Sequence, residues 1–264
     1  MYLFCIQDNH IYMVIKSNKR DFKANKLKIG TRGSPLALAQ ALEVKKEIIK
    51  HHKLNDQSVE IISISTKGDR VIDRPLTEIG GKGLFTEEIE NKLFHNEIDI
   101  AVHSMKDMPT EFPTGLGINT FLKREDFRDS FVSLKYNSIN ELPVGAVVGS
   151  SSIRRKAQLL SIRPDLKVVE FRGNVQTRLK KLEDGVADAT FLACAGLIRL
   201  GMEDLVNPIS PEVMMPAIAQ GIIGIEQRLN DNEITELLFP LNHEQTKTQA
   251  LVERAFLQVL DGSC

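Results

Sequence analysis

The chain has 264 residues, and its 34 Lys and Arg against 35 Asp and Glu give a formal net charge of −1. The 42% apolar and 26% charged fractions are typical of a globular protein and exclude a disordered or fibrous one. Because the charges balance and Trp is absent, we expect no nucleic-acid partner, and any polyanion site requires basic residues clustered locally.

Residues 1–26 mix basic side chains with Asp8 and Asp21 and lack a secretory signal, so we expect a poorly ordered N-terminal extension. An organelle transit sequence and a start at Met13 are the alternatives. No apolar run approaches the roughly 18 residues that a membrane span needs. The cysteines form no C-x-x-C pair, which predicts no disulfide framework and no structural zinc. Together these features predict a soluble, cytoplasmic protein without a membrane partner. The three cysteines are Cys5, Cys194 and Cys264.

From Leu27 onward, short apolar runs alternate with amphipathic stretches, which is typical of an α/β domain. Ser34-Pro35 predicts the start of a helix, with Ser34 as N-cap. A second helix is predicted at 84–94, and the result is a βαβαβ unit. The apolar face of the first helix is predicted to hold Leu38, Ala41, Leu42, Ile48 and Ile49. The strands are predicted at 27–31, 59–65 and 99–103.

A second cycle of strands and helices begins near Asp129. The Pro-rich segment 208–216 is interpreted as a crossing back, and a further strand is predicted at 221–227. The other strands of this part are predicted at 131–134, 146–149, 167–171 and 189–194. Its helices are predicted at 152–161, 174–182, 233–238 and 243–260.

The last predicted helix carries an apolar stripe that requires a packing partner. Either the two earlier units cover this stripe, or a following segment does. The stripe consists of Val252, Phe256, Val259 and Leu260.

Basic residues recur where predicted strands pass into helices. In an open α/β sheet these turns converge on a crevice at the carboxyl ends of the strands, where helix N-termini attract anions. Arg side chains add paired N–H groups that match carboxylates. The pattern therefore predicts a site for an anion with several carboxylates or phosphates, although one such residue alone is better explained as a solvated loop side chain. The residues are Arg32, Lys82, Lys106, Arg154, Arg155, Arg172 and Arg178.

One acid, Asp107, is predicted within this basic crevice. Its carboxylate could stabilise a developing positive charge or exchange a proton with a leaving amine. The alternative, that Asp107 only balances Lys106, is left open by the sequence.

Motifs of several enzyme classes are absent. Lys82 is followed by Gly rather than Ser or Thr, which excludes a Walker loop. No G-x-S-x-G surrounds Ser34 or Ser152, which argues against a serine hydrolase. The histidines form no H-E-x-x-H, so His95 and His103 are expected to have core or surface roles and no metal site is predicted.

Eight motifs in order, from about Leu27 to the last residue, together resemble the porphobilinogen deaminase family. They are TRGSPLALAQA at 31–41, GGKGLF at 80–85, AVHSMKDMPTEFP at 101–113, VGSSSIRRKAQL at 148–159, FRGNVQTRLKKL at 171–182, AGLIRLG at 195–201, AIAQGIIGIE at 217–226 and LDGSC at 260–264. The resemblance implies a transferase of porphyrin and heme biosynthesis. Such an enzyme joins four porphobilinogen units, releases ammonia at each step and produces the linear tetrapyrrole hydroxymethylbilane.

The resemblance also implies roles for particular residues. A dipyrromethane cofactor would be attached by a thioether to Cys264, and Asp107 would be the catalytic aspartate. The residues implied to hold the cofactor are Lys106, Ser150, Ser152, Arg154, Arg155, Arg172 and Gln220. Those implied to hold the substrate are Arg32, Ser34, Lys82, Arg178 and Arg199. We expect a monomer that acts on a small molecule.

The fold implied by the resemblance is α/β, with two periplasmic-binding-protein-like domains around a cleft and an incomplete small third α/β domain. Domain 1 would comprise 27–122 and 219–239, domain 2 would comprise 123–218, and residues 241–264 would begin domain 3. The chain departs from the family pattern at Glu78, where some members have Lys. It also ends at Cys264, whereas the family continues.

Two further hypotheses stand beside the enzyme. The chain could be a non-catalytic, periplasmic-binding-like protein that binds anions reversibly, without involvement of Cys264. It could also be an inactive truncated fragment, for which a low or uncooperative thermal transition is expected.

Overall fold

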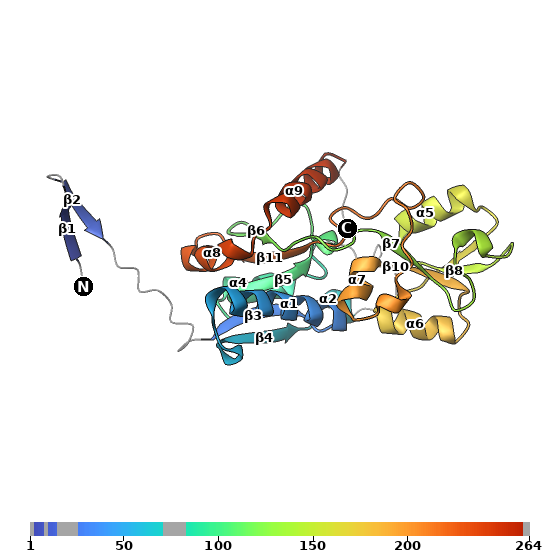
Figure 1. Cartoon of the computed structure of the whole chain (residues 1–264), viewed down its shortest axis with the longest axis horizontal. Helices are drawn as coiled ribbons and strands as arrows, with labels where there is room; N and C mark the ends of the chain where they lie inside the picture. Colours follow the sequence, from blue (N-terminus) through green and yellow to red (C-terminus); the bar gives the residue numbers. More distant parts are fainter. Residues whose placement is uncertain (1–2, 8–9, 15–25, 71–82, 261–264) are drawn as a thin grey trace.

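The computed structural model describes residues 3–7, 10–14, 26–70 and 83–260, and two α/β units lie side by side along its long axis (Figure 1). The strands are β1 Leu3–Gln7, β2 His10–Val14, β3 Leu27–Arg32, β4 Val59–Ile64, β5 Ile100–Ser104, β6 Leu116–Phe121, β7 Asp129–Val132, β8 Val147–Gly149, β9 Lys167–Val169, β10 Ala189–Ala193 and β11 Ile223–Arg228. The α-helices are α1 Pro35–His52, α2 Lys67–Arg70, α4 Glu87–Phe94, α5 Ile153–Ile162, α6 Val175–Glu183, α7 Cys194–Arg199, α8 Asn232–Leu238 and α9 Glu244–Val259. Short 3-10 turns include η2, Met105–Asp107.

The first unit is built on a five-stranded sheet with the order β4-β3-β5-β11-β6. β3 is parallel to β4 and β5, whereas β11 is antiparallel to β5 and β6. Helix α1 begins as predicted, since the Ala37 N–H donates to Ser34 Oγ at 3.3 Å. α1 packs Ala41, Val44 and Ile48 on one face of the sheet, and α4 packs Ile89 and Leu93 on the other. The sheet is therefore covered on both faces, and loops at its edge are free to form a site.

The second unit is built on a four-stranded sheet with the order β7-β10-β8-β9. β10 is parallel to β8 and antiparallel to β7. Leu159 of α5 packs with Phe131 and Phe191 on one face, and Leu182 of α6 packs with Phe171 on the other. The two sheets confirm the predicted α/β class with two α/β units. Because β11 follows this unit in sequence but belongs to the first sheet, the chain crosses between the units twice.

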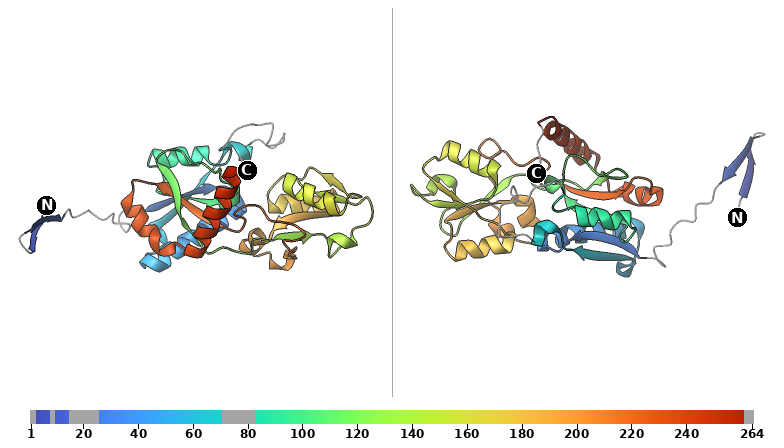
Figure 2. Two further views of the ribbon diagram at one scale, coloured as in Figure 1. Left: turned by 90° about the horizontal axis from the view of Figure 1, so that it is seen from above. Right: turned by 180° about the vertical axis from the view of Figure 1, so that it is seen from behind.

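A hairpin precedes the two units. β1 and β2 pair antiparallel, with Leu3 opposite Val14 and Gln7 opposite His10. The hairpin lies apart from both units in every view (Figures 1 and 2). The sequence analysis predicted neither strand.

Several predicted elements need correction. β6 and α7 were not predicted, and Cys194 begins α7 rather than ending a strand. The helix predicted from Leu84 begins at Glu87, because residues 83–86 form a turn that places Thr86 at the N-cap. Leu42, predicted on the apolar face of α1, is 47% exposed. The buried face of α1 is centred on Ala41, Val44 and Ile48, which leaves Leu42 at its margin.

The helix α9 packs through Thr246, Ala250 and Arg254 and leaves its predicted apolar stripe uncovered. The Arg254 guanidinium, almost fully buried, donates to the carbonyl oxygens of Met108 and Pro109. Among the described residues neither unit covers the predicted stripe, since Val252 is 65% exposed and Phe256 60% exposed. The two earlier units therefore do not supply the partner that the sequence required.

The two crossings between the units meet at Gly221. Its φ is +87°, and its carbonyl oxygen accepts from the Glu125 N–H at 3.2 Å. A Cβ at this position would lie 2.5 Å from the backbone oxygen of Glu125. Only glycine meets both conditions without strain.

We expect Gly221→Ala to lower the free energy of unfolding by about 3 kcal/mol, because left-handed strain and a backbone clash add. The matched control is Gly185→Ala, where φ is +72° but no atom lies within 4 Å of the added carbon. It should cost only the strain, about 1 kcal/mol. Urea unfolding of both variants measures the difference, and equal losses would contradict this account of the crossing.

Candidate active site

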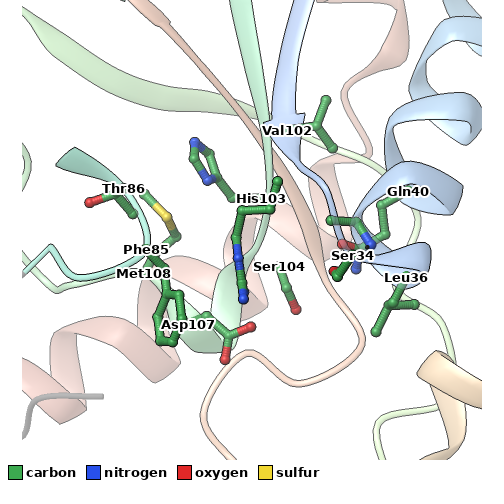
Figure 3. Close-up of a pocket in the computed structure, with 12 residues that line it drawn as sticks. Ser34, Leu36, Gln40, Phe85, Thr86, Val102, His103, Ser104, Asp107 and Met108 are labelled. Carbon is green, nitrogen blue, oxygen red and sulfur yellow. Dashed lines mark hydrogen bonds between the residues drawn. The ribbon is translucent and has the colours of Figure 1, made fainter. Parts of the chain in front are cut away.

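A pocket opens at the edge of the five-stranded sheet where β5 ends. It is open to solvent on one side. Figure 3 shows Asp107 on one side of it with Phe85, and Ser34 and Gln40 on the other. Asp107 is the last residue of η2 and is exposed. The predicted aspartate is thus placed on a rigid turn directly after a buried strand.

Arg32 lines the same pocket and is held by two neighbours. Its guanidinium forms an ion pair with Asp69 and lies over the Phe85 ring, 4.1 Å from the ring centroid. Burial alone would raise the pKa of Asp69, but hydrogen bonds from Arg32 and Thr66 lower it below its usual value. These contacts fix the direction of the Arg32 side chain at the pocket wall.

Cations from both units meet around Asp107. Burial lowers the pKa of Lys106 although the Asp107 charge acts against this, and burial with the Arg155 charge lowers the pKa of Arg178 to about 10. Both shifts indicate positive charges close together in a place partly closed to water. The groups whose charges act on Lys106 are Asp107, Arg155, Asp129 and Arg178. The structure therefore brings η2 of the first unit together with β7, α5 and α6 of the second.

A residue that the sequence analysis did not identify, Asp129, organises this cluster. Its carboxylate is completely buried and lies 2.6 Å from Arg155 Nη2 and 2.7 Å from Arg154 Nη1. Gln220 Nε2 also donates to it, at 3.0 Å. Burial would raise the pKa of Asp129, but Arg155 and Arg154 outweigh burial and lower it to about 2. A signal was present, since this acid lies two residues before the strand predicted at 131–134.

The predicted serines lie at helix N-termini. Ser152 is the N-cap of α5, and its Oγ accepts from the Arg155 N–H at 3.3 Å. Ser150 Oγ accepts from the Ser152 N–H at 3.2 Å. Ser34 caps α1 in the same way. These serines therefore orient helix ends whose remaining N–H groups suit an anion.

Two predicted basic residues have other contacts. Arg199 Nε lies 2.9 Å from Glu43 Oε2, and Arg199 Nη2 donates to the Gly221 carbonyl oxygen at 3.1 Å. Arg199 thus connects α7 of the second unit with α1 of the first. Arg172 is half-buried in the turn before α6. Lys82, Glu78 and Cys264 lie outside the described residues, and their predicted roles stay predictions.

Two other predicted features concern metals and thiols. Among the residues that the structure describes, no group of three or more His, Cys, Asp or Glu side chains could hold a metal ion. Cys194 is buried, and burial raises the pKa of its thiol to about 11. A thiol with so high a pKa is a poor nucleophile.

The donor set fits a ligand with several carboxylates. In the described part of the chain, buried Arg155 Nε has no hydrogen-bond partner, and neither has Gln220 Oε1. An unpaired buried guanidinium N–H is costly, and a carboxylate oxygen would satisfy it. Pyrrole rings with acetate and propionate side chains offer such carboxylates to Arg155. Gln220 Oε1 is an acceptor, and a pyrrole N–H group could donate to it. The residues present therefore fit a dipyrromethane cofactor.

Comparison with known proteins supports the same assignment of the site. Residues 27–236 match the family model described as "Porphobilinogen deaminase, dipyromethane cofactor binding domain". The porphobilinogen deaminase of Paracoccus denitrificans is 60% identical over 241 residues, which cover 91% of this chain and 77% of the relative.

Solved structures with similar folds share little sequence with this chain. A nutrient-binding protein from Burkholderia cenocepacia bound to methionine aligns with a TM-score of 0.46 and 14% sequence identity. The alignment covers 88% of this chain and 94% of that protein's chain. A periplasmic substrate-binding protein of an ABC transporter from Coxiella burnetii aligns with a TM-score of 0.44 and 17% sequence identity. That alignment covers 90% of this chain and 99% of the transporter protein's chain.

Proposed function

The chain belongs to the porphobilinogen deaminase family, and we propose that the pocket beside Asp107 is where it binds and condenses porphobilinogen. As a member of that family it joins four porphobilinogen units, with release of ammonia, into hydroxymethylbilane for porphyrin and heme biosynthesis. The observation that carries the proposal is that charged groups of two units act on one another here: Lys106 and Asp107 on η2, and Arg155 and Arg178 on the second unit.

In the proposed mechanism Asp107 is the catalytic residue. Each condensation breaks the carbon–nitrogen bond of the substrate's aminomethyl group and releases ammonia, so positive charge develops on the pyrrole ring. A carbon–carbon bond to the growing chain then forms, and the accepting carbon loses a proton. The Asp107 carboxylate stabilises that charge and exchanges a proton with the leaving amine. Being exposed at the end of η2, it can approach the substrate without rearrangement of β5.

The basic residues bind and orient carboxylates in this mechanism. On the first unit Arg32 does so, and the Ser34 hydroxyl adds a hydrogen bond. Lys82, which lies outside the described residues, is a further proposed substrate residue. On the second unit Arg178 contributes a charge that acts on Asp107 itself, and Arg199 stays a proposed substrate residue. Holding the substrate at several points fixes its reacting carbon near Asp107, which lowers the entropic barrier to condensation.

The cofactor of the family is dipyrromethane, which supplies the pyrrole carbon that accepts the first substrate unit. We propose that Cys264 holds it by a thioether. Arg155 and Gln220 support binding of the cofactor at this site, because among the described residues the buried donor Arg155 Nε and the buried acceptor Gln220 Oε1 have no partner. A cofactor carboxylate would accept from the first, and a pyrrole N–H group would donate to the second. The other proposed cofactor-holding residues are Lys106, Ser150, Ser152, Arg154 and Arg172.

We also propose the domain division expected from the sequence, with 27–122 and 219–239 as domain 1, 123–218 as domain 2 and 241–264 as the start of domain 3. The pairing of β11 with β5 and β6 supports the return of the chain to domain 1. Within the described residues, none of the helices is both long and apolar enough to cross a bilayer. We propose a monomer that acts in the cytoplasm on a small molecule, with no nucleic-acid or membrane partner.

Cofactor loading gives a direct test of the Cys264 assignment. After incubation with porphobilinogen, intact-mass measurement should show two linked pyrrole units on the chain, and peptide mapping should place them at Cys264. Cys194→Ser is the control and should load normally, because Cys194 is buried and its thiol protonated. Reversible binding of porphobilinogen without covalent mass would instead support the non-catalytic anion-binding hypothesis.

A further inference from the structure

A buried group of three titratable residues lies behind the pocket wall, between α4 and the five-stranded sheet. His103 comes from β5, Glu226 from β11 and Glu90 from α4. His103 Nε2 is 2.9 Å from Glu226 Oε2. The three residues are 6%, 0% and 7% exposed, respectively. His103 also lines the pocket, although its ring turns away from Asp107 (Figure 3).

The register of the sheet explains how these residues meet. In the antiparallel pair of β5 and β11, Gly224 lies opposite His103 and Glu226 lies opposite Ala101. Because alternate residues of a strand share a face, His103 and Glu226 are diagonal neighbours on the face that α4 covers. Ala101 packs with Ile89 and Leu93 of α4 on that face, and Glu90 is in the first turn of the same helix. The cluster is therefore fixed by three regular elements.

The charges of the cluster do not balance unless it holds protons. Buried Oε1 atoms of Glu226 and Glu90 have no hydrogen-bond partner among the described residues. Burial first, and the Glu226 charge second, raise the pKa of Glu90. Even a charged His103 would neutralise only one of the two carboxylates. The Thr86 side chain and the His103 charge act in the opposite direction, but burial and the Glu226 charge outweigh them. Retention of a proton by the cluster is therefore favoured.

The other charged residues on these elements do not supply that balance. Arg228, two residues beyond Glu226 on β11, donates to the carbonyl oxygens of Leu93 at 2.8 Å and Ile98 at 2.9 Å. Its other Nη is 3.0 Å from Asp231. Glu87 of α4 adds a further negative charge that acts on Glu90. In the described part of the chain, His103 is the basic side chain that contacts a carboxylate of the cluster.

We propose that His103, Glu226 and Glu90 form a proton-holding cluster that keeps the wall of the pocket electrically neutral and thereby sets its affinity for carboxylate substrates. The Glu90 carboxyl holds that proton. When the pH rises, that carboxyl releases its proton to solvent, and a negative charge appears behind a wall that must attract anions. The cluster acts on the substrate through this field, and the inference rests on the proposed function of the pocket.

The test compares Glu90→Gln with Glu87→Gln, an exposed carboxylate in the same turn of α4. Infrared spectra at neutral pH should show the carbonyl band of a protonated carboxyl in the wild type and in Glu87→Gln, but not in Glu90→Gln. As the pH rises through the range in which the Glu90 carboxyl band disappears, the KM of the wild type should rise several-fold, whereas that of Glu90→Gln should stay within about twofold. Thermal unfolding should show Glu90→Gln more stable than the wild type near pH 8 and equal to it near pH 4. The reason is that a raised folded-state pKa destabilises the ionised form only at higher pH.

Glu226→Gln provides a second variant. Without the Glu226 charge, the carboxyl band of Glu90 should titrate away at lower pH than in the wild type. A band that survives Glu90→Gln, or an unchanged KM profile in that variant, would overturn the proposal. If no variant binds porphobilinogen at any pH, the proposed function fails, while the infrared and unfolding data still decide whether the cluster holds the proton.

Discussion

Asp107→Asn is expected to lower kcat for hydroxymethylbilane formation by about 10²–10⁴-fold, the range that positioned proton transfer and charge stabilisation contribute. Asn matches Asp in size but has no negative charge. Because Asp107 is exposed at the end of η2, the substitution removes no buried contact of the fold. The loss should therefore appear in kcat and leave the unfolding temperature unchanged.

The matched control is Asp184→Asn, which removes another exposed carboxylate, paired with Lys180 on the surface of α6. Both variants should carry the covalent cofactor by intact mass, so that a loss of kcat reports on catalysis rather than on loading. Turnover of Asp107→Asn within about threefold of the wild type would contradict the role given to Asp107.

Asp129→Asn is expected to lower the free energy of unfolding by about 3–5 kcal/mol, the usual cost of removing one partner of a buried ion pair. Arg155 would be left with a buried charge, and Arg154 would lose its partner at the same carboxylate. The two guanidiniums would then repel each other. We expect KM for porphobilinogen to rise together with the loss of stability, because Arg155 would no longer be held in place.

The lowered pKa of Asp129 determines how the loss of stability in Asp129→Asn depends on pH. The pKa of Asp129 is lowered to about 2 in the folded protein, so its ionised form is the one that folding favours. Its stabilising contribution is complete above about pH 4 and is lost as the pH falls toward 2. Urea unfolding should therefore show a large difference between wild type and Asp129→Asn at pH 7 and a smaller one near pH 3. A variant as stable as the wild type at pH 7 would contradict the organising role of Asp129.

The parts of the fold that the sequence predicts are those with strong local signals. Ser34 followed by Pro35 specifies a helix start, and the apolar run from Leu27 specifies a buried strand. β6 was missed because Gly115, Gly117 and Asn119 dilute its strand pattern. It forms because β11 provides a partner on one side. α7 was missed because the apolar run of β10 continues into it without a helix-start signal.

The residues of the candidate site were likewise predicted only where a rule based on local sequence or element order applies. Lys106, Asp107 and Arg155 were predicted because strand ends converge in an α/β sheet, a rule that needs only the order of elements. Asp129 and the pair of His103 with Glu226 were missed because their partners are far away in sequence. His103 and Glu226 are 123 residues apart and meet only through the register of β5 and β11. Pairings of this kind follow from tertiary structure, which no local pattern encodes.

A crystal structure of Asp107→Asn with its cofactor attached and porphobilinogen bound tests the central claim most directly. The account predicts ligand carboxylates within hydrogen-bond distance of cations from both units, with Lys106 on one side and Arg155 or Arg178 on the other. Carboxylates bound to one unit alone, or remote from residue 107, would contradict it.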